Sequence, residues 1–222
     1  MSQCLFSFER QTSTPCLMSI YEREPSDKWI DDYVKEFESD DANKYHAANY
    51  NAVIKCVQKF HPNDHHYENI FLKVTLINDA FKAGVRDTMG LAKCIFNNSQ
   101  NIDSRLKTKD YSLLKDLQCY TNKDKTYRFY SFATKYCHCH YPDKYYIYDS
   151  FVKTSLIQFH RNHSPKMEGF IQNRLVQYDY FEQVMDNFKA TFNLTVSNQA
   201  VDRFLWGIGK KNKPKSNKKK ML

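Results

Sequence analysis

Apolar side chains recur at intervals of three and four residues along most of the chain, which is the period of an amphipathic helix. Ser26 stands before the first such stretch as a candidate N-cap, and Gly84 stands after the third as a candidate C-terminal glycine. Strict alternation of apolar and polar residues, the pattern of a strand, is scarce. The periodicity predicts helices over residues 27–37, 42–60, 68–84, 87–97, 111–120, 127–140, 150–160, 180–192 and 198–209.

The sequence therefore predicts an all-α protein with a single compact multi-helix domain at residues 26–210. Residues 1–25 contain Thr, Ser and two prolines without a period, so we expect an irregular lead-in. Residues 211–222 are rich in lysine and lack apolar periodicity, so we expect a disordered basic tail. With only 5 glycines and 6 prolines in 222 residues, a turn-rich β architecture is not expected.

The chain carries 33 Lys and Arg against 25 Asp and Glu, and this formal charge of +8 favours an anionic partner such as nucleic acid. Seven of the lysines lie between Lys210 and Lys220, where there is no acid, so the rest of the chain is nearly neutral. Within that rest, residues 105–165 hold eleven bases and five acids. The basic character of the body is thus concentrated near its middle.

No apolar run reaches the roughly 18 residues that a membrane helix needs, and the amino terminus has no signal-peptide pattern, so we expect a cytoplasmic protein. The 7 cysteines are an odd number in a chain large enough to fold without disulfides, which favours free thiols. There is no glycine-rich phosphate loop. We expect no small-molecule cofactor, no membrane partner and a monomer.

The segment YSFATKYCHCHYPDKYYIYDS, residues 130–150, holds the candidate chemistry. Lys135 lies in an otherwise apolar and aromatic helix, where desolvation of the ammonium would lower its pKa and make the amine a nucleophile. Asp149 precedes a predicted helix, where a carboxylate accepts amide hydrogen bonds and suits the helix dipole. A solvated surface lysine and a simple helix cap are the alternative interpretations, and these residue types alone do not decide between them.

The Cys-His-Cys-His run at residues 137–140 resembles a set of metal ligands. Consecutive helical residues point about 100° apart, however, so four of them cannot converge on one tetrahedral ion. A second cluster, His61, His65 and His66, has the neighbours of an ordinary polar loop. We therefore expect no metal site.

Aromatic residues are dense between Tyr127 and Phe151, in the most basic third of the body. Core packing accounts for most of them. Because they are interleaved with cations such as Arg128 and Lys144, they would also suit stacking against nucleic-acid bases combined with phosphate contacts.

Several segments together resemble a known family: SFATKYC followed by His140, Pro142 and IYDS, FLKVTLINDAFKAGV at 71–85, and VDRFLWGIGK at 201–210. They are similar to a group of bacterial proteins assigned the 8-oxoguanine DNA glycosylase fold, within the helix-hairpin-helix DNA glycosylase superfamily. The resemblance covers roughly residues 40–210. It implies an all-α glycosylase fold and a partner that is double-stranded DNA with a damaged or modified base.

In bifunctional members of that superfamily a lysine attacks the anomeric carbon of a flipped nucleotide, and an aspartate assists departure of the base. Lys135 and Asp149 match these two roles. The implied function is a DNA N-glycosylase, with abasic-site lyase activity as an accompanying step. Phe132, Tyr136 and Tyr148 are the candidates for lining the base pocket.

Characterised relatives carry a glycine-rich hairpin just before the lysine, and the corresponding KDKTYRFYS at residues 123–131 has no glycine. Phosphate contacts would instead come from side chains, for which the candidates are Lys123, Lys125, Arg128 and Lys144. The missing hairpin keeps a second hypothesis open, a non-catalytic nucleic-acid-binding or phage-defence subunit that retains the fold. A third is a structural protein with a solvated lysine tail and no role on DNA.

Overall fold

The structure, a computed structural model, describes residues 19–41, 43–59, 66–122, 125–164, 166–167 and 169–212. Its elements, with η marking a short 3-10 helix, are η1 (Ile20–Glu22), α1 (Asp27–Ser39), α2 (Lys44–Lys59), α3 (Tyr67–Phe81), α4 (Thr88–Asn98), α5 (Ile102–Thr108), α6 (Ser112–Gln118), β1 (Cys119–Asn122), β2 (Lys125–Arg128), α7 (Tyr130–His140), α8 (Ser150–Asn162), η2 (Gln172–Val176), α9 (Tyr178–Thr191) and α10 (Asn198–Lys211).

Side-chain caps begin several of the helices. Ser26, the expected N-cap, accepts the backbone N–H of Trp29 at the start of α1. Ser197 does the same for Ala200 at the start of α10. Each cap provides an acceptor for an amide that has no partner inside its own helix, which is typically worth about 1 kcal/mol. These polar residues therefore help to fix where each helix begins.

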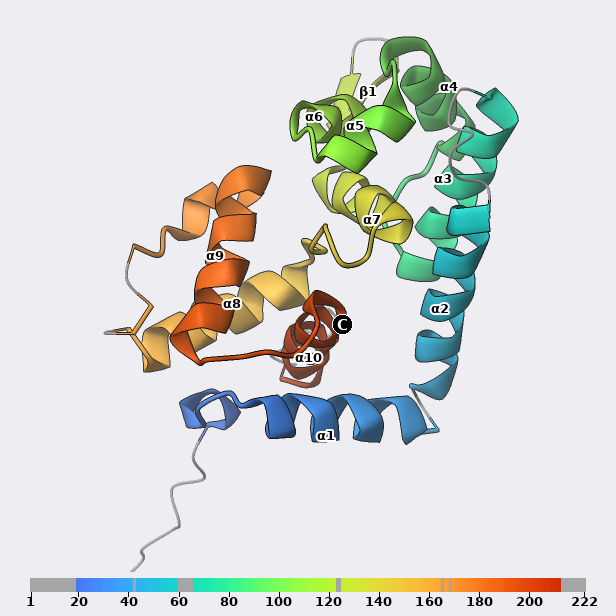
Figure 1. Ribbon diagram of the computed structural model, residues 1–222. Helices are drawn as coiled ribbons and strands as arrows, with labels where there is room; N and C mark the ends of the chain where they lie inside the picture. Colours follow the sequence, from blue (N-terminus) through green and yellow to red (C-terminus); the bar gives the residue numbers. More distant parts are fainter. Residues whose placement is uncertain are drawn as a thin grey trace, which may run out of the picture.

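Helix α7 lies at the centre of one group of helices (Figure 1). It packs against α2, α3 and α6, and α3 packs in turn against α2 and α4. Every residue from Phe132 to His140 is buried. Because this helix is covered on all sides, each polar side chain on it needs a partner inside the protein.

A second group of helices is built on α10, which packs against α8 and α1 (Figure 1). The Phe204 ring lies 4.8 Å from Trp29 of α1 and 6.2 Å from Phe159 of α8, measured between ring centroids. Phe159 in turn lies 5.4 Å from Phe188 of α9. Truncating a buried ring of this kind to alanine typically costs about 3–5 kcal/mol, so this aromatic cluster is a major source of stability.

The prediction of a mostly helical fold is confirmed for the described residues, and none of their helices is long and apolar enough to cross a membrane. Several predicted segments lie outside the described residues: residues 1–18 of the lead-in, both ends of the helix predicted at 42–60, and residues 213–222 of the tail. The described part of the lead-in contains η1. The helix-hairpin-helix glycosylase fold is not established by this architecture.

The all-α expectation is wrong at residues 119–128, where β1 and β2 form an antiparallel hairpin. Tyr120 pairs with Tyr127, and their rings stack at 6.1 Å between centroids. Thr121 and Thr126 pair next to them with hydroxyl oxygens 3.1 Å apart. Aromatic and β-branched cross-strand pairs stabilise a sheet, and here they take in the ends of the helices predicted at 111–120 and 127–140 together with residues that had no predicted element. Helix α7 accordingly begins at Tyr130 rather than at Tyr127.

Helices α8 and α10 approach closely at Gly209. A Cβ atom at this position would lie 2.3 Å from the backbone oxygen of Phe151 and 2.9 Å from Oγ of Ser155. Ser155 also donates a hydrogen bond of 2.7 Å to the carbonyl of Leu205 across the same contact. The absence of a side chain at Gly209 therefore sets the spacing of the two helices.

We predict that Gly209→Ala lowers the free energy of unfolding by about 1–3 kcal/mol, because backbone atoms must move to accept the methyl group. Urea denaturation measures this loss. Gly207→Ala is the matched control on the same helix, since the atoms nearest to its Cβ would belong to the side chain of Tyr33, which can move more easily than backbone. A Gly209→Ala protein as stable as the wild type would contradict the close approach.

Candidate functional site

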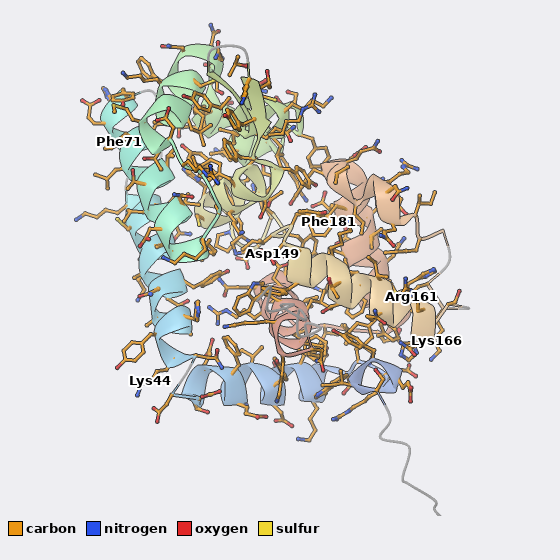
Figure 2. All side chains as sticks on the ribbon, turned by 180° about the vertical axis from the view of Figure 1, so that it is seen from behind. Lys44, Phe71, Asp149, Arg161, Lys166 and Phe181 are labelled. Carbon is orange, nitrogen blue, oxygen red and sulfur yellow. The ribbon has the colours of Figure 1, made fainter. Side chains whose placement is uncertain are left out.

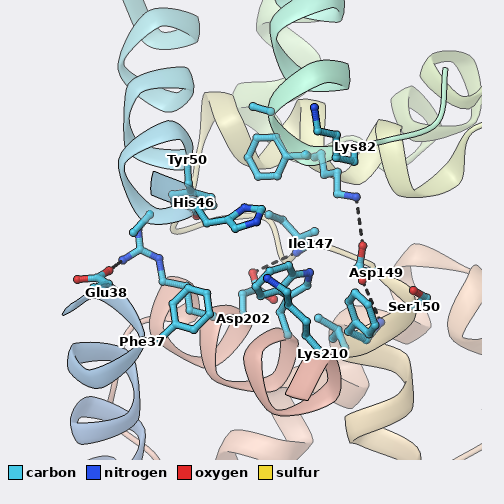
Figure 3. Close-up of a pocket in the computed structure, with 18 residues that line it drawn as sticks. Phe37, Glu38, His46, Tyr50, Lys82, Ile147, Asp149, Ser150, Asp202 and Lys210 are labelled. Atoms are coloured by element: carbon cyan, nitrogen blue, oxygen red, sulfur yellow. Dashed lines mark hydrogen bonds and ion pairs between the residues drawn. The ribbon is translucent and has the colours of Figure 1, made fainter. Parts of the chain in front are cut away.

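A cavity of about 360 Å³ lies where α1, α2, α7, α8 and α10 meet beside the end of α3 (Figure 3). Aromatic side chains form much of its wall, namely Phe37, Tyr50, Phe81, Phe151 and Trp206. The charged side chains that reach it are Glu38, Lys82, Lys135, Asp149, Asp202, Arg203 and Lys210. The cavity thus combines flat apolar surfaces with ionisable groups, as binding pockets for small polar molecules do.

Lys135 reaches this cavity from the middle of α7, and its side chain is only 5% exposed. Its Nζ donates hydrogen bonds to Oγ of Ser131 at 2.9 Å and to Oδ2 of Asp149 at 3.3 Å. Burial lowers the pKa of Lys135 below its usual 10.5, although the charge of Asp149 acts in the opposite direction. A larger fraction of this amine is therefore neutral than for a lysine in water.

Asp149 is the N-cap of α8, and Figure 2 shows it at the start of that helix, inside the molecule. Its Oδ1 accepts the backbone N–H of Phe151 at 2.9 Å, which leaves Oδ2 for Lys135. Asp149 is therefore a helix cap that also forms an ion pair with a buried amine, and the alternative of a solvated surface lysine is wrong for Lys135. The pair joins α7 to α8.

Asp202 of α10 is a second buried carboxyl group at the cavity, with 4% of its surface exposed. Its Oδ2 accepts the backbone N–H of Ile147 at 3.1 Å, and its Oδ1 has no hydrogen-bond partner among the described residues. Burial raises the pKa of Asp202 well above its usual 3.8. Because Oδ2 is already an acceptor, the neutral acid carries its proton on Oδ1.

A short hydrogen-bond chain supports the wall beside Asp202. Nδ1–H of His138 donates to the carbonyl of Tyr145 at 2.5 Å, so Nε2 is left to accept the hydroxyl proton of Tyr50. Burial lowers the pKa of His138 to about 4, so the imidazole is neutral at pH 7. This chain fixes the ring of Tyr50 at the cavity.

The Cys-His-Cys-His run on α7 does not converge. His138 bonds to Tyr50 and Tyr145, whereas His140 bonds to Lys73 and to the carbonyl of Tyr136. Across the residues that the structure describes, no three His, Cys, Asp or Glu side chains are placed to hold a metal ion. His61 and His65 of the other cluster lie outside those residues.

The residues predicted to contact phosphate lie away from the cavity. Lys125 and Arg128 are exposed on β2, and Lys144 is exposed with its Nζ donating to the carbonyl of Lys107 at 2.9 Å. Lys123 lies outside the described residues. None of these three cations lines the cavity: Lys125 and Arg128 lie on the hairpin, and Lys144 contacts the end of α5.

The aromatic residues predicted for the base pocket are placed in the core. Phe132 and Tyr136 are fully buried on α7, and Tyr148 packs against Tyr130 and Phe181. Other aromatic side chains line the cavity, among them Trp206 of α10.

Sequence reasoning assigned no role to the cavity residues of α10. Asp202, Trp206 and Lys210 are spaced four residues apart, so they share one face of the helix. A lone acid in the apolar stretch VDRFLWGIG was the available signal, and it can be seen in the printed sequence.

Comparison with known proteins places the chain in a family. Residues 29–144 match the model of HI_0787_N, described as an N-terminal domain. The chain belongs to this family. It is also 34% identical over 154 residues to an uncharacterized protein of Haemophilus influenzae, and this match covers 69% of the chain and 73% of the relative. No solved structure matches the chain significantly.

None of these matches carries the description of a glycosylase, so membership of that superfamily stays a prediction. The HI_0787_N segment contributes Lys135 and the walls from α1 to α3, and it ends before Asp149 and Asp202. The cavity therefore lies between the matched HI_0787_N segment and residues 145–212.

We predict that Asp202→Asn changes the pH dependence of stability. In the unfolded chain Asp202 ionises above pH 3.8, whereas burial favours its protonated form in the folded protein. The free energy of unfolding of the wild type therefore falls as pH rises from 3.8 towards the pKa of the folded protein, by up to about 1.4 kcal/mol per pH unit. Asparagine carries no charge and removes this loss. Urea denaturation at pH 5 and pH 8 compares the two proteins, with the exposed Asp31→Asn as the control. A constant difference between wild type and Asp202→Asn at both pH values would contradict the assignment.

Proposed function

We propose that the protein is a DNA N-glycosylase with abasic-site lyase activity, acting on double-stranded DNA with a damaged or modified base. The observation that carries the proposal is the Lys135–Asp149 pair, 3.3 Å between Nζ and Oδ2, at the wall of an aromatic cavity. A buried amine with a lowered pKa is the nucleophile that such chemistry needs. The helix-hairpin-helix glycosylase fold is part of the same proposal.

The cavity suits an extruded base. Its volume of about 360 Å³ lies within the range of about 300–1,000 Å³ usual for small-molecule pockets. An enzyme that cleaves a glycosidic bond in duplex DNA must take the nucleotide out of the stack, and aromatic rings then replace the lost stacking. Phe151 and Trp206, whose centroids are 5.9 Å apart in an edge-on arrangement, supply such rings next to Asp149.

The reaction follows from the two side chains. Neutral Nζ of Lys135 attacks C1′ of the nucleotide, the bond from C1′ to the base nitrogen breaks, and the base leaves with the bonding pair and takes up a proton. The C1′–O4′ bond then breaks, O4′ takes up a proton and the adduct becomes a Schiff base. In the β-elimination that follows, C2′ loses a proton to water and the C3′–O bond breaks with the phosphate as the leaving group. Asp149 stabilises the positive charge on the sugar and receives the proton that Nζ gives up.

The second candidate function is a non-catalytic nucleic-acid-binding or phage-defence subunit. The observation in its favour is the β1–β2 hairpin, because every residue of β2 is exposed and two of the four, Lys125 and Arg128, are basic. Such a surface would bind phosphates without chemistry, and its affinity for DNA would fall steeply with salt. The two functions differ in whether a covalent intermediate forms.

Borohydride reduction tests for that intermediate. We predict that the wild-type protein, mixed with duplex DNA containing an abasic site and then reduced, gives a covalent adduct visible by gel electrophoresis. Lys135→Gln should give none, because it removes the amine that contacts Asp149. Asp149→Asn should form the adduct at least about a hundredfold more slowly. Lys93→Gln, which removes an exposed lysine on α4, should behave like the wild type.

Equal trapping by wild type and Lys135→Gln would refute the Schiff base. Salt-dependent DNA binding with no adduct from the wild type would favour the non-catalytic function. Duplexes that each carry one modified base, incubated with the wild type, then identify the base by the abasic product that appears.

A further inference from the structure

The cavity has a buried floor and a cationic mouth. Lys135 and Asp202 form the floor, each with 4% of its surface exposed. His46 and Lys82 are exposed and Lys210 is half-buried, although all three also line the cavity. A molecule that fills this space would place its apolar part against the aromatic wall and its polar part among these three side chains.

The three mouth residues come from separate elements (Figure 3). His46 lies near the start of α2, Lys82 is the C-cap that follows α3 in a left-handed conformation, and Lys210 lies in the last turn of α10. Two of them meet at one indole: the Trp206 ring lies 4.7 Å from Nζ of Lys210 and 5.8 Å from the ring of His46. Lys82 lines the same cavity from the end of α3, so the basic groups come from separate parts of the fold rather than from one helix face.

The two lysines at the mouth form only weak interactions with other side chains of the protein. Nζ of Lys210 donates to Oδ1 of Asn43 at 3.4 Å, which is at the long limit of a hydrogen bond. Lys82 pairs with Asp79 at 2.9 Å, but both side chains are more than 70% exposed, and such a pair contributes little. By contrast, Arg203 at the same cavity is held by Glu38 and Asn51.

The mouth is electrostatically positive at His46. Burial, together with the charges of Lys210 and Lys82, lowers the pKa of this imidazole from its usual 6.5. An anion bound between these groups would offset the repulsion and favour the protonated imidazole. The charged and titratable groups that share the cavity with His46 are Tyr50 of α2, Glu38 of α1, Lys82 after α3, Lys135 of α7, Asp149 before α8, and Asp202, Arg203 and Lys210 of α10.

We infer that His46, Lys82 and Lys210 form a phosphate-binding site at the mouth of the cavity, which holds a backbone phosphate of the nucleotide whose base lies against the aromatic wall. The inference rests on the proposed function, which identifies the molecule in the cavity as an extruded nucleotide. It deepens that proposal, because it names the side chains that would hold the DNA backbone beside the extruded nucleotide. It also provides phosphate contacts that are independent of the β1–β2 hairpin.

Binding of duplex DNA with a tetrahydrofuran abasic analogue tests the site without requiring any chemistry. We expect Lys210→Gln to weaken the affinity for DNA about tenfold at low salt, because it removes one charge-assisted hydrogen bond to phosphate. The slope of log K against log salt concentration should also become smaller by about 1. Lys211→Gln is the matched control, because Lys211 is exposed on the next position of α10 and does not line the cavity. Equal losses from the two variants would overturn the inference.

The pH dependence tests His46. A bound phosphate raises the pKa of His46 above its pKa in the free protein. The affinity that the protonated imidazole adds is therefore complete below the pKa of the free protein, and it is lost as pH rises through the pKa of the complex. We expect wild-type affinity to fall about tenfold between pH 5.5 and pH 8, as when binding raises the pKa by about one unit. His46→Gln should flatten this profile, and Lys211→Gln should keep it. A profile unchanged by His46→Gln would overturn the inference.

Competition separates the sources of phosphate. A nucleoside 5′-monophosphate should displace the duplex at much lower concentration than inorganic phosphate, because its base also contacts the aromatic wall of the cavity. Equal competition would overturn the nucleotide assignment. These binding results do not depend on borohydride trapping. If the wild type gives no adduct but its affinity keeps the pH dependence that His46→Gln removes, only the catalytic proposal is refuted. If the wild type gives the adduct but the variants of His46 and Lys210 change neither trapping nor affinity, only the phosphate site is refuted.

Discussion

The ammonium of Lys135 is placed inside the protein, and much of the surrounding arrangement follows from that constraint. Taking such a charge out of water costs several kcal/mol even after relaxation, so it needs a carboxylate and further hydrogen bonds nearby. Ser131 and Asp149 supply them. Removing one partner of a buried pair typically costs about 3–5 kcal/mol. The pair therefore fixes the start of α8 relative to α7, and it does so at the wall of a cavity.

Helix α10 supplies the rest of that cavity. Gly209 lets it lie close to α8, and the face with Asp202, Trp206 and Lys210 is thereby directed at the space beside Lys135. One helix thus carries a buried acid, a flat ring and a cation in successive turns, from floor to mouth. The matched HI_0787_N segment holds the amine, and residues that follow it hold both carboxyl groups. Neither part has the complete site.

Local patterns predicted most of the helices because the amphipathic period and the caps are properties of short segments. Ser26 is an example, since its role depends only on the three residues that follow. The hairpin was missed because its stability comes from cross-strand pairs such as Tyr120 with Tyr127, and the two strands are too short to show an alternating pattern. Local composition also identified Lys135 and Asp149. It could not identify His46 or Asp202, because their place at the cavity depends on contacts between distant helices. Phe132 and Tyr136 were proposed for the pocket with the glycosylase resemblance, because they lie beside Lys135 in an aromatic segment, and neither ground distinguishes a core ring from a lining ring.

The central claim is that burial makes the amine of Lys135 less basic while Asp149 keeps part of it charged. NMR titration of the Lys135 side chain, with the signal assigned by comparison with Lys135→Gln, measures this property directly. The account predicts a pKa below 10.5 in the wild type and a lower one in Asp149→Asn, because the opposing charge is then absent. A pKa at or above 10.5 in the wild type, or one that rises in Asp149→Asn, would contradict it.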